Sequence, residues 1–175
     1  MNGPEGPYLQ MALNNAWANA TLYDAIFKLP DGAFEAPRPG FFPSLSRTMN
    51  HIYEVDLYHL DALEQGGLGR GVFVRDDVPD PADLGRLQAE VDQRLAMFCG
   101  KLDAGILAEG RTTERRGGLK VEERVDMLLL NLFQHQVHHR GQAHVQLQDA
   151  GVPPPQLDEF FLEFGRAQSA EPYHG

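Results

Sequence analysis

Four long segments carry apolar side chains at intervals of three and four residues, and this pattern strongly constrains the fold of the chain. In the first segment the repeat runs through Met11, Ala18, Leu22 and Ile26. A helix with one apolar face has to bury that face against other helices. We therefore predict an all-α four-helix bundle, with helices at about residues 8–29, 44–65, 81–101 and 121–150.

Capping and helix-breaking residues mark the ends of these segments. Ser44 and Asp80 stand where N-caps are expected, and Pro81 suits the first turn of a helix. Gly66 and Gly151 follow the predicted ends of the second and fourth helices, as C-terminal glycines do. The boundaries of the second, third and fourth helices are therefore predicted independently of the apolar pattern.

The remaining segments are less regular. Residues 102–119 contain four glycines and are compatible with a short hairpin or with a plain loop. A short C-terminal helix is expected at about residues 158–165. Because 175 residues fit one hydrophobic core, we expect a single domain over residues 1–175, with its core at about 8–165.

The composition excludes several classes of protein. The formal net charge of −10 argues against nucleic-acid binding, which needs a basic surface. Cys99 is the single cysteine, so no internal disulfide can form and a cytoplasmic location is expected. No apolar run approaches the roughly 18 residues of a membrane span, and the first residues do not resemble a signal peptide.

The stretch HQVHHRGQAH, residues 135–144, contains four histidines on one predicted helix. At about 100° per residue, His135 and His139 continue the inward face begun by Leu128. His138 lies at the edge of that face, and His144 lies on the opposite side, where we expect solvent. Two histidines at positions i and i+4 can converge on one metal ion.

A third inward histidine is found on the second predicted helix. His51 shares a face with Val55 and Tyr58, whereas His59 is turned by about 80° toward the flank. Neutral imidazole suits nickel, zinc and iron, so His51, His135 and His139 are the predicted metal ligands. The alternative is that each histidine is a core residue satisfied by ordinary hydrogen bonds. The sequence does not show whether the two helices place these side chains at the same height.

The same residues resemble a known family. HQVHHRGQAHVQLQDAG is similar to the fourth-helix signature HxxxHRGQ of the DinB/YfiT-like metalloenzymes. NNAWANATLYDAI, residues 14–26, and FPSLSRTMNHIYEVDLYHL, residues 42–60, resemble the first- and second-helix patterns of the DinB branch. The motifs occur in the family's order and extend from Met11 to Gly151. The family is unrelated to the DNA polymerase that shares its name.

The resemblance implies an up-down-down-up bundle with a long crossover, and a divalent metal held by His51, His135 and His139. It also implies homodimers and a low-molecular-weight thiol as partner of an unidentified small-molecule substrate. Three protein ligands leave coordination positions open, as in a catalytic site. One hypothesis is therefore a metal-dependent enzyme, such as a thiol-dependent S-transferase or a hydrolase. The other is a non-enzymatic, metal-dependent stress or regulatory bundle that acts through a protein partner.

Polar residues near the predicted ligands are expected to have structural or orienting roles. Arg140 points away from the ligand face, and a structural salt bridge to another helix is expected. Gln142 faces the site and is a candidate to orient a ligand from outside. Asn15 and Asn19 are expected to cap or cross-link helices.

For three further side chains, ordinary packing in the protein interior is an alternative to a role in the site. Tyr58 lines a pocket or simply packs, Trp17 is expected in the core, and Cys99 is expected to be an inert apolar residue. Glu54 is close to His51 in sequence but is not clearly on its face, so no general base is predicted.

Overall fold

The computed structural model describes residues 6–158 and confirms a mostly helical protein. Its four long helices are α1 (Gly6–Ile26), α2 (Leu45–Glu64), α3 (Pro81–Cys99) and α5 (Val125–Asp149). Shorter elements are the 3-10 helices η1 (Gly69–Phe73) and η2 (Arg116–Gly118), the helix α4 (Ala104–Ala108), and the strands β1 (Gly110–Glu114) and β2 (Lys120–Arg124). The helix expected at about 158–165 lies outside the described residues, apart from its first position.

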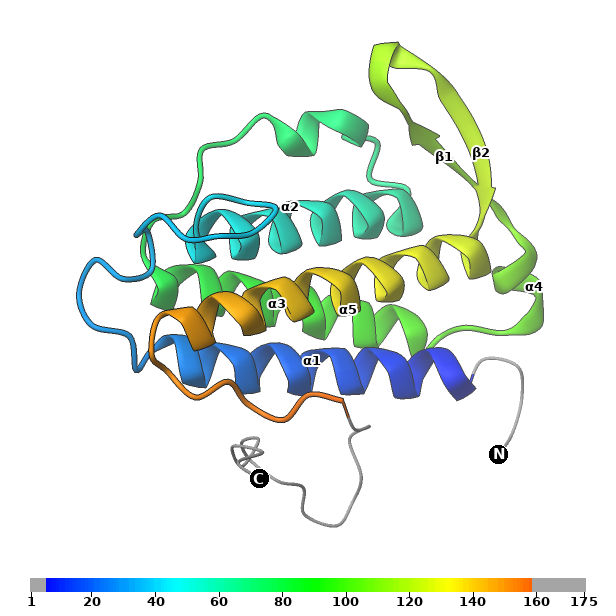
Figure 1. Cartoon of the computed structure of the whole chain (residues 1–175). Helices are drawn as coiled ribbons and strands as arrows, with labels where there is room; N and C mark the ends of the chain where they lie inside the picture. The colour runs from blue at the N-terminus through cyan, green and yellow to red at the C-terminus, as the bar shows by residue number, and fades with distance from the viewer. Residues whose placement is uncertain (1–5, 159–175) are drawn as a thin grey trace.

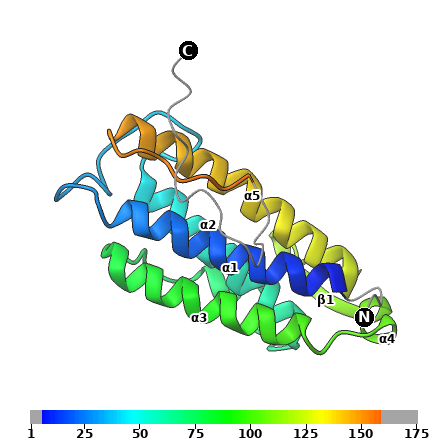
Figure 2. The same ribbon diagram turned by 90° about the horizontal axis from the view of Figure 1, so that it is seen from below.

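The four long helices pack side by side, and each contacts two others. α1 and α2 each lie against α3 and against α5. In Figure 1, α1 and α5 run from right to left, whereas α2 and α3 run from left to right. The connection from α2 to α3 includes η1 and returns along α2 (Figure 1). Figure 2 shows α1 between α3 and α5, in agreement with these contacts.

The predicted caps of α2 and α3 are confirmed. The Ser44 hydroxyl accepts a hydrogen bond from the Arg47 backbone N–H at 3.2 Å. The Asp80 carboxylate accepts two from the first turn of α3. α2 ends at Glu64, and its C-cap Gln65 has a φ of 59°, which places it in the left-handed region. α1 ends at Ile26, three residues before the predicted end.

The predicted start of the fourth long helix is wrong by four residues, because residues 120–124 form a strand. β2 pairs antiparallel with β1, with Thr112 opposite Glu122. Gly117 and Gly118 both have φ of 78° and turn the chain between the strands. Of the two alternatives for residues 102–119, the hairpin is the one observed, preceded by α4.

The apolar core falls into two clusters separated by buried polar side chains. One cluster includes Leu22, Met49 and Leu84, and the other includes Leu95 and Leu132. Between them lies a buried polar layer, to which all four long helices contribute and which consists of Asn15, Asn19, Asp56, Gln88, Asp92, Gln136 and Arg140.

Membrane crossing by a helix is not supported. Among residues 6–158, no helix combines the length and the apolarity that spanning a bilayer requires.

Candidate metal centre

The three predicted ligands converge between α2 and α5. His51 comes from α2, and His135 and His139 come from consecutive turns of α5. One ring nitrogen of each histidine lies within 4.8 Å of the others. The Nε2 atoms of His51 and His135 are 3.0 Å apart, and the three ring centroids are between 4.3 and 4.9 Å apart. The packing of α2 on α5 thus supplies the common height that the sequence left undetermined.

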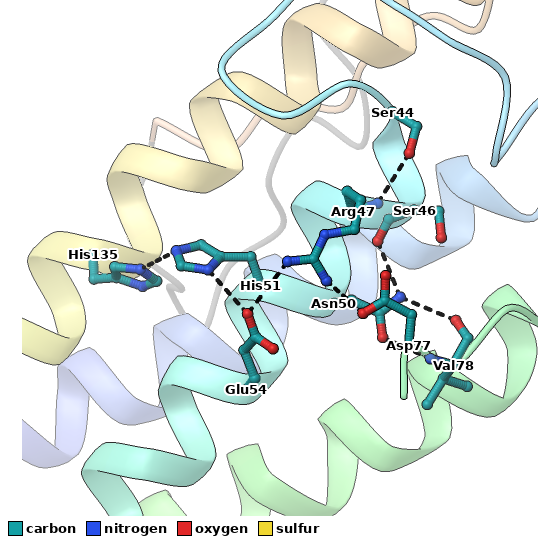
Figure 3. A network of polar contacts seen from close by, with 9 residues as sticks. All are labelled: Ser44, Ser46, Arg47, Asn50, His51, Glu54, Asp77, Val78 and His135. Atoms are coloured by element: carbon teal, nitrogen blue, oxygen red, sulfur yellow. Dashed lines mark hydrogen bonds and ion pairs between the residues drawn. The ribbon is translucent and has the colours of Figure 1, made fainter. Parts of the chain in front are cut away.

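Glu54 holds the outer face of His51. Its Oε1 atom lies 3.3 Å from His51 Nδ1, and the Arg47 guanidinium lies 3.5 Å from the same carboxylate (Figure 3). Burial alone would raise the pKa of Glu54, but the His51 hydrogen bond and the Arg47 charge outweigh it and lower the pKa. The sequence did not place Glu54 clearly on the His51 face, and the structure shows that the two side chains are in contact. Their i,i+3 spacing was the signal that could have found this contact.

Gln142 performs the corresponding role for His139. Its Oε1 atom accepts a hydrogen bond from His139 Nδ1 at 2.9 Å, so the prediction that it orients a ligand agrees with the geometry. Its amide nitrogen lies 3.0 Å from His138 Nε2. His138 is exposed, and its ring meets that of His139 edge to face, with ring centroids 4.8 Å apart. With the Nδ1 atoms of His51 and His139 engaged, their Nε2 atoms are left to face the cluster.

The surroundings of His135 and His139 favour the neutral form of both rings. Burial, followed by the neighbouring His139 and His51, lowers the pKa of His135 to about 3. Burial is also the largest cause of the lowered pKa of His139. Neutral imidazoles present lone pairs, which is the form that binds a metal ion. The Nδ1 atom of His135 is buried and has no hydrogen-bond partner among the described residues.

The aromatic residues before α2 cover the cluster. The Phe42 ring centroid lies 4.6 Å from that of His51 and 5.7 Å from that of His139. The Phe42 carbonyl accepts a hydrogen bond from Gln146 at 3.0 Å, which ties this loop to α5. Sequence reasoning missed this contact, because it joins residues far apart in the chain.

His59 and His144 have hydrogen-bond partners of their own. His59 Nδ1 donates to the Val55 carbonyl at 2.9 Å, and its Nε2 atom lies 3.0 Å from the Asn131 amide nitrogen. Burial lowers the pKa of His59. His144 lies away from the cluster as predicted, but it is half-buried and bonds to the Pro155 carbonyl at 3.1 Å. Neither histidine belongs to the cluster.

Arg140 links α5 to α1 as expected, although its partners are not carboxylates. Its guanidinium donates to the amide oxygens of Asn15, Asn19 and Gln136, and among the described residues it forms no ion pair. The amide nitrogens of Asn15 and Asn19 in turn donate to Asp92. The predicted salt bridge is therefore replaced by a bridge of amides, and the cross-linking role of both asparagines is confirmed.

Cys99 and Trp17, for which a packing role was predicted, lie outside the site. Cys99 is buried on α3, and burial raises its pKa to about 12, which agrees with an inert thiol. Trp17 is half-buried on α1 rather than fully in the core.

A cavity of about 580 Å³ opens on the cluster. Val55, Tyr58 and Asn131 line it between α2 and α5, so the pocket alternative for Tyr58 is the one observed. The hairpin and η1 complete the wall with residues that sequence reasoning did not connect to the site, namely Phe73, Arg70, Arg115 and Arg116. The cluster is therefore accessible to a small molecule.

Fold and site together define a class: helical proteins with a three-histidine cluster that could hold a metal ion at the end of a cavity. The model of the DinB family matches residues 1–171, and the chain belongs to this family. The match is to the DinB family, as the resemblance implied, and not to the DNA polymerase.

Related proteins come from Bacillus species. The chain is 21% identical over 152 residues to Protein DinB of Bacillus subtilis (strain 168), covering 82% of this chain and 86% of that protein. A crystal structure of a DinB-like protein from Bacillus cereus ATCC 10987 aligns with a TM-score of 0.66 at 17% identity, covering 85% of this chain and 94% of the other. The DinB-like protein YjoA from Bacillus subtilis gives a TM-score of 0.60 at 16% identity, covering 83% and 92%. At these identities the structural likeness shows a common fold.

Proposed function

We propose that this protein binds one divalent metal ion through His51, His135 and His139 and is a metal-dependent enzyme. The observation that carries the proposal is the convergence of three imidazoles, with ligand atoms within 4.8 Å, at the end of a cavity. Nickel, zinc and iron are the candidate metals, because all three accept imidazole ligands. Three ligands from the chain leave positions open for a substrate.

The chain's own residues prepare this site. Glu54 and Gln142 accept from the outer nitrogens of His51 and His139, which fixes the ring tautomer and orientation. A bound ion would supply Lewis acidity and a lowered pKa for a water or thiol at the open position. Phe42 packs on two of the three rings and limits the access of water from that side.

The reaction we favour is thiol-dependent S-transfer to a small electrophile, with hydrolysis as the related alternative. A thiolate is a suitable ligand for the candidate metals, and the cavity has room for a small thiol beside the cluster. The proposal also takes the four helices as the up-down-down-up bundle implied by the family resemblance, assembled as a homodimer in the cytoplasm.

A second candidate is a non-enzymatic bundle that responds to metal and acts through a protein partner. One observation favours it. The outer face of α5 exposes apolar side chains at helical spacing, with Leu130, Val137 and Val145 each more than half exposed. Exposed apolar surfaces of this kind are typical of interaction sites. Thiol-dependent turnover that is lost on chelation would exclude this candidate.

The metal site is tested with untagged protein. We expect about one divalent ion per chain by elemental analysis, and a higher Tm with the metal than after chelation, because ligand at about 100 times its Kd stabilises by about 2.7 kcal/mol. His139→Ala should lose both the ion and the difference in Tm. The control His144→Ala, on the same helix but outside the cluster, should keep both. Equal metal content in the two variants would contradict the assignment.

A further inference from the structure

The cavity extends well beyond the histidine cluster, along the groove between α2 and α5. Its lining includes both His51 and Tyr58, which are two helical turns apart and therefore about 10 Å apart along α2. At this far end, the Tyr58 hydroxyl donates to the Glu114 carbonyl on β1 at 2.7 Å. The hairpin is thus fixed to α2 at a defined distance from the cluster.

The far wall carries guanidinium groups. Arg70 comes from η1, and Arg115 and Arg116 come from the hairpin turn. Arg115 is ion-paired with Glu123 at 2.6 Å. Within residues 6–158, neither Arg70 nor Arg116 forms an ion pair, and Arg70 stacks on the Phe73 ring at 5.2 Å. Arg70 and Arg116 therefore line the cavity without carboxylate partners among residues 6–158, in a chain with a net charge of −10.

Glu114 is the acidic residue in this wall, and its carboxylate is turned toward the backbone. Its Oε2 atom accepts from the Arg70 backbone N–H at 3.4 Å and lies beside Gly69. Glu114 thus joins η1 to β1 rather than pairing with a side-chain cation. Its charge only partly offsets those of Arg70 and Arg116.

Between the two ends the lining is largely apolar. Val55, Phe73 and the ring of Tyr58 separate the histidines from the arginines. His59 also lines this part, but both of its ring nitrogens are already engaged. A ligand that fills the cavity would therefore meet a metal-binding cluster, an apolar passage and a cationic wall, in that order.

We propose that the site selects small molecules that carry an anionic group, such as a carboxylate, at the end opposite to the atom that reaches the histidine cluster. Arg70 and Arg116 bind the anionic group, and an apolar chain of the ligand occupies the passage. This inference rests on the proposed metal centre and specifies its substrate class. Guanidinium groups recognise carboxylates well because they offer paired, charge-assisted hydrogen bonds.

The test uses the full chain loaded with cobalt(II) and two probes, 6-mercaptohexanoate and the neutral 6-mercaptohexanol. Thiolate ligation is read from the charge-transfer absorption of cobalt, so binding is measured without any enzyme activity. We expect the acid to bind at least about tenfold more tightly than the alcohol, because its second end gains a charge-assisted contact. The preference should decrease as salt is added.

Variants identify the residues responsible. The double variant Arg70→Gln with Arg116→Gln should bring the acid and the alcohol to equal affinity. The matched control is Arg86→Gln with Arg94→Gln, which removes two exposed charges from α3 and should keep the preference. The comparison of acid with alcohol in the unmodified protein does not depend on the folding of any variant.

Separate outcomes test the inference and the metal centre. Equal affinity of the two probes in the unmodified protein would overturn the anion site and leave the metal centre standing. If no thiol produces the absorption band, the open metal centre itself is wrong, and the inference falls with it.

Discussion

At the scale of single residues, the cluster depends on groups that hold the histidines from outside. His51 has the carboxylate of Glu54, and His139 has the amide oxygen of Gln142. Arg47 pairs with both Glu54 and Asp77, and so connects the support of His51 to the loop before α3 (Figure 3). Outer partners of this kind fix the ring that a metal will bind and contribute strongly to affinity.

We predict that Glu54→Gln lowers metal affinity about tenfold, because the carboxylate charge that polarises His51 is lost while the shape is kept. The affinity is measured by competition with a chromophoric chelator. Glu64→Gln is the control, since Glu64 lies on the same helix and pairs with Arg94. Identical Kd values for both variants and the unmodified protein would show that Glu54 has no positioning role.

At the scale of elements, α2 positions the site because its start is fixed. Ser44 caps its first turn, and Asn50 exchanges two hydrogen bonds with the backbone of Val78, at 2.8 and 3.0 Å (Figure 3). These contacts place His51 two turns into the helix and attach the loop before α3 to it. The hairpin acts at the other end of the cavity, where β1 contacts Tyr58.

We predict that Ser44→Ala lowers the free energy of unfolding by about 1 kcal/mol, the usual effect of losing an N-cap. Chemical denaturation measures the change. Ser44→Asp should restore most of the stability, since aspartate also caps and its charge suits a helix N-terminus. An alanine variant as stable as the unmodified protein would mean that tertiary packing alone fixes the start of α2.

At the scale of the whole molecule, the buried polar layer joins all four long helices. Asp56 and Asp92 lie in it together with one cation, Arg140. Burial, followed by the charge of Asp92, raises the pKa of Asp56 well above its usual value. Burial also raises the pKa of Asp92 from 3.8 to about 6. Such a layer costs desolvation free energy, but its many directed bonds favour one arrangement of the helices.

These raised pKa values predict a dependence of stability on pH. A carboxyl group whose pKa is higher in the folded state stabilises below its ordinary pKa, and this contribution is lost as pH rises toward the folded value. For Asp92 the window lies between 3.8 and about 6, which corresponds to about 3 kcal/mol. The pKa of Asp56 is raised as well, so Asp56 contributes a change of the same sign. Asp56→Asn removes this contribution and should therefore gain stability relative to the unmodified protein as pH rises from 4 to 8.

Denaturation with a chelator present measures this effect without a contribution from metal. The control is Asp24→Asn, which removes an exposed carboxylate from α1. A constant difference between Asp56→Asn and the unmodified protein across this pH range would show that Asp56 does not titrate as the buried layer requires.

The sequence by itself determined the four long helices, the N-caps of α2 and α3 and the inward direction of His51, His135 and His139. Helical periodicity and capping are local, so they can be read along one segment. Residues 120–124 show the limit, because a strand there depends on pairing with residues 110–114. Tertiary structure alone decided the common height of the histidines, the amide bridge of Arg140 and the arginine wall of the cavity. These features join residues far apart in the chain, and only the packing of whole elements fixes their distances.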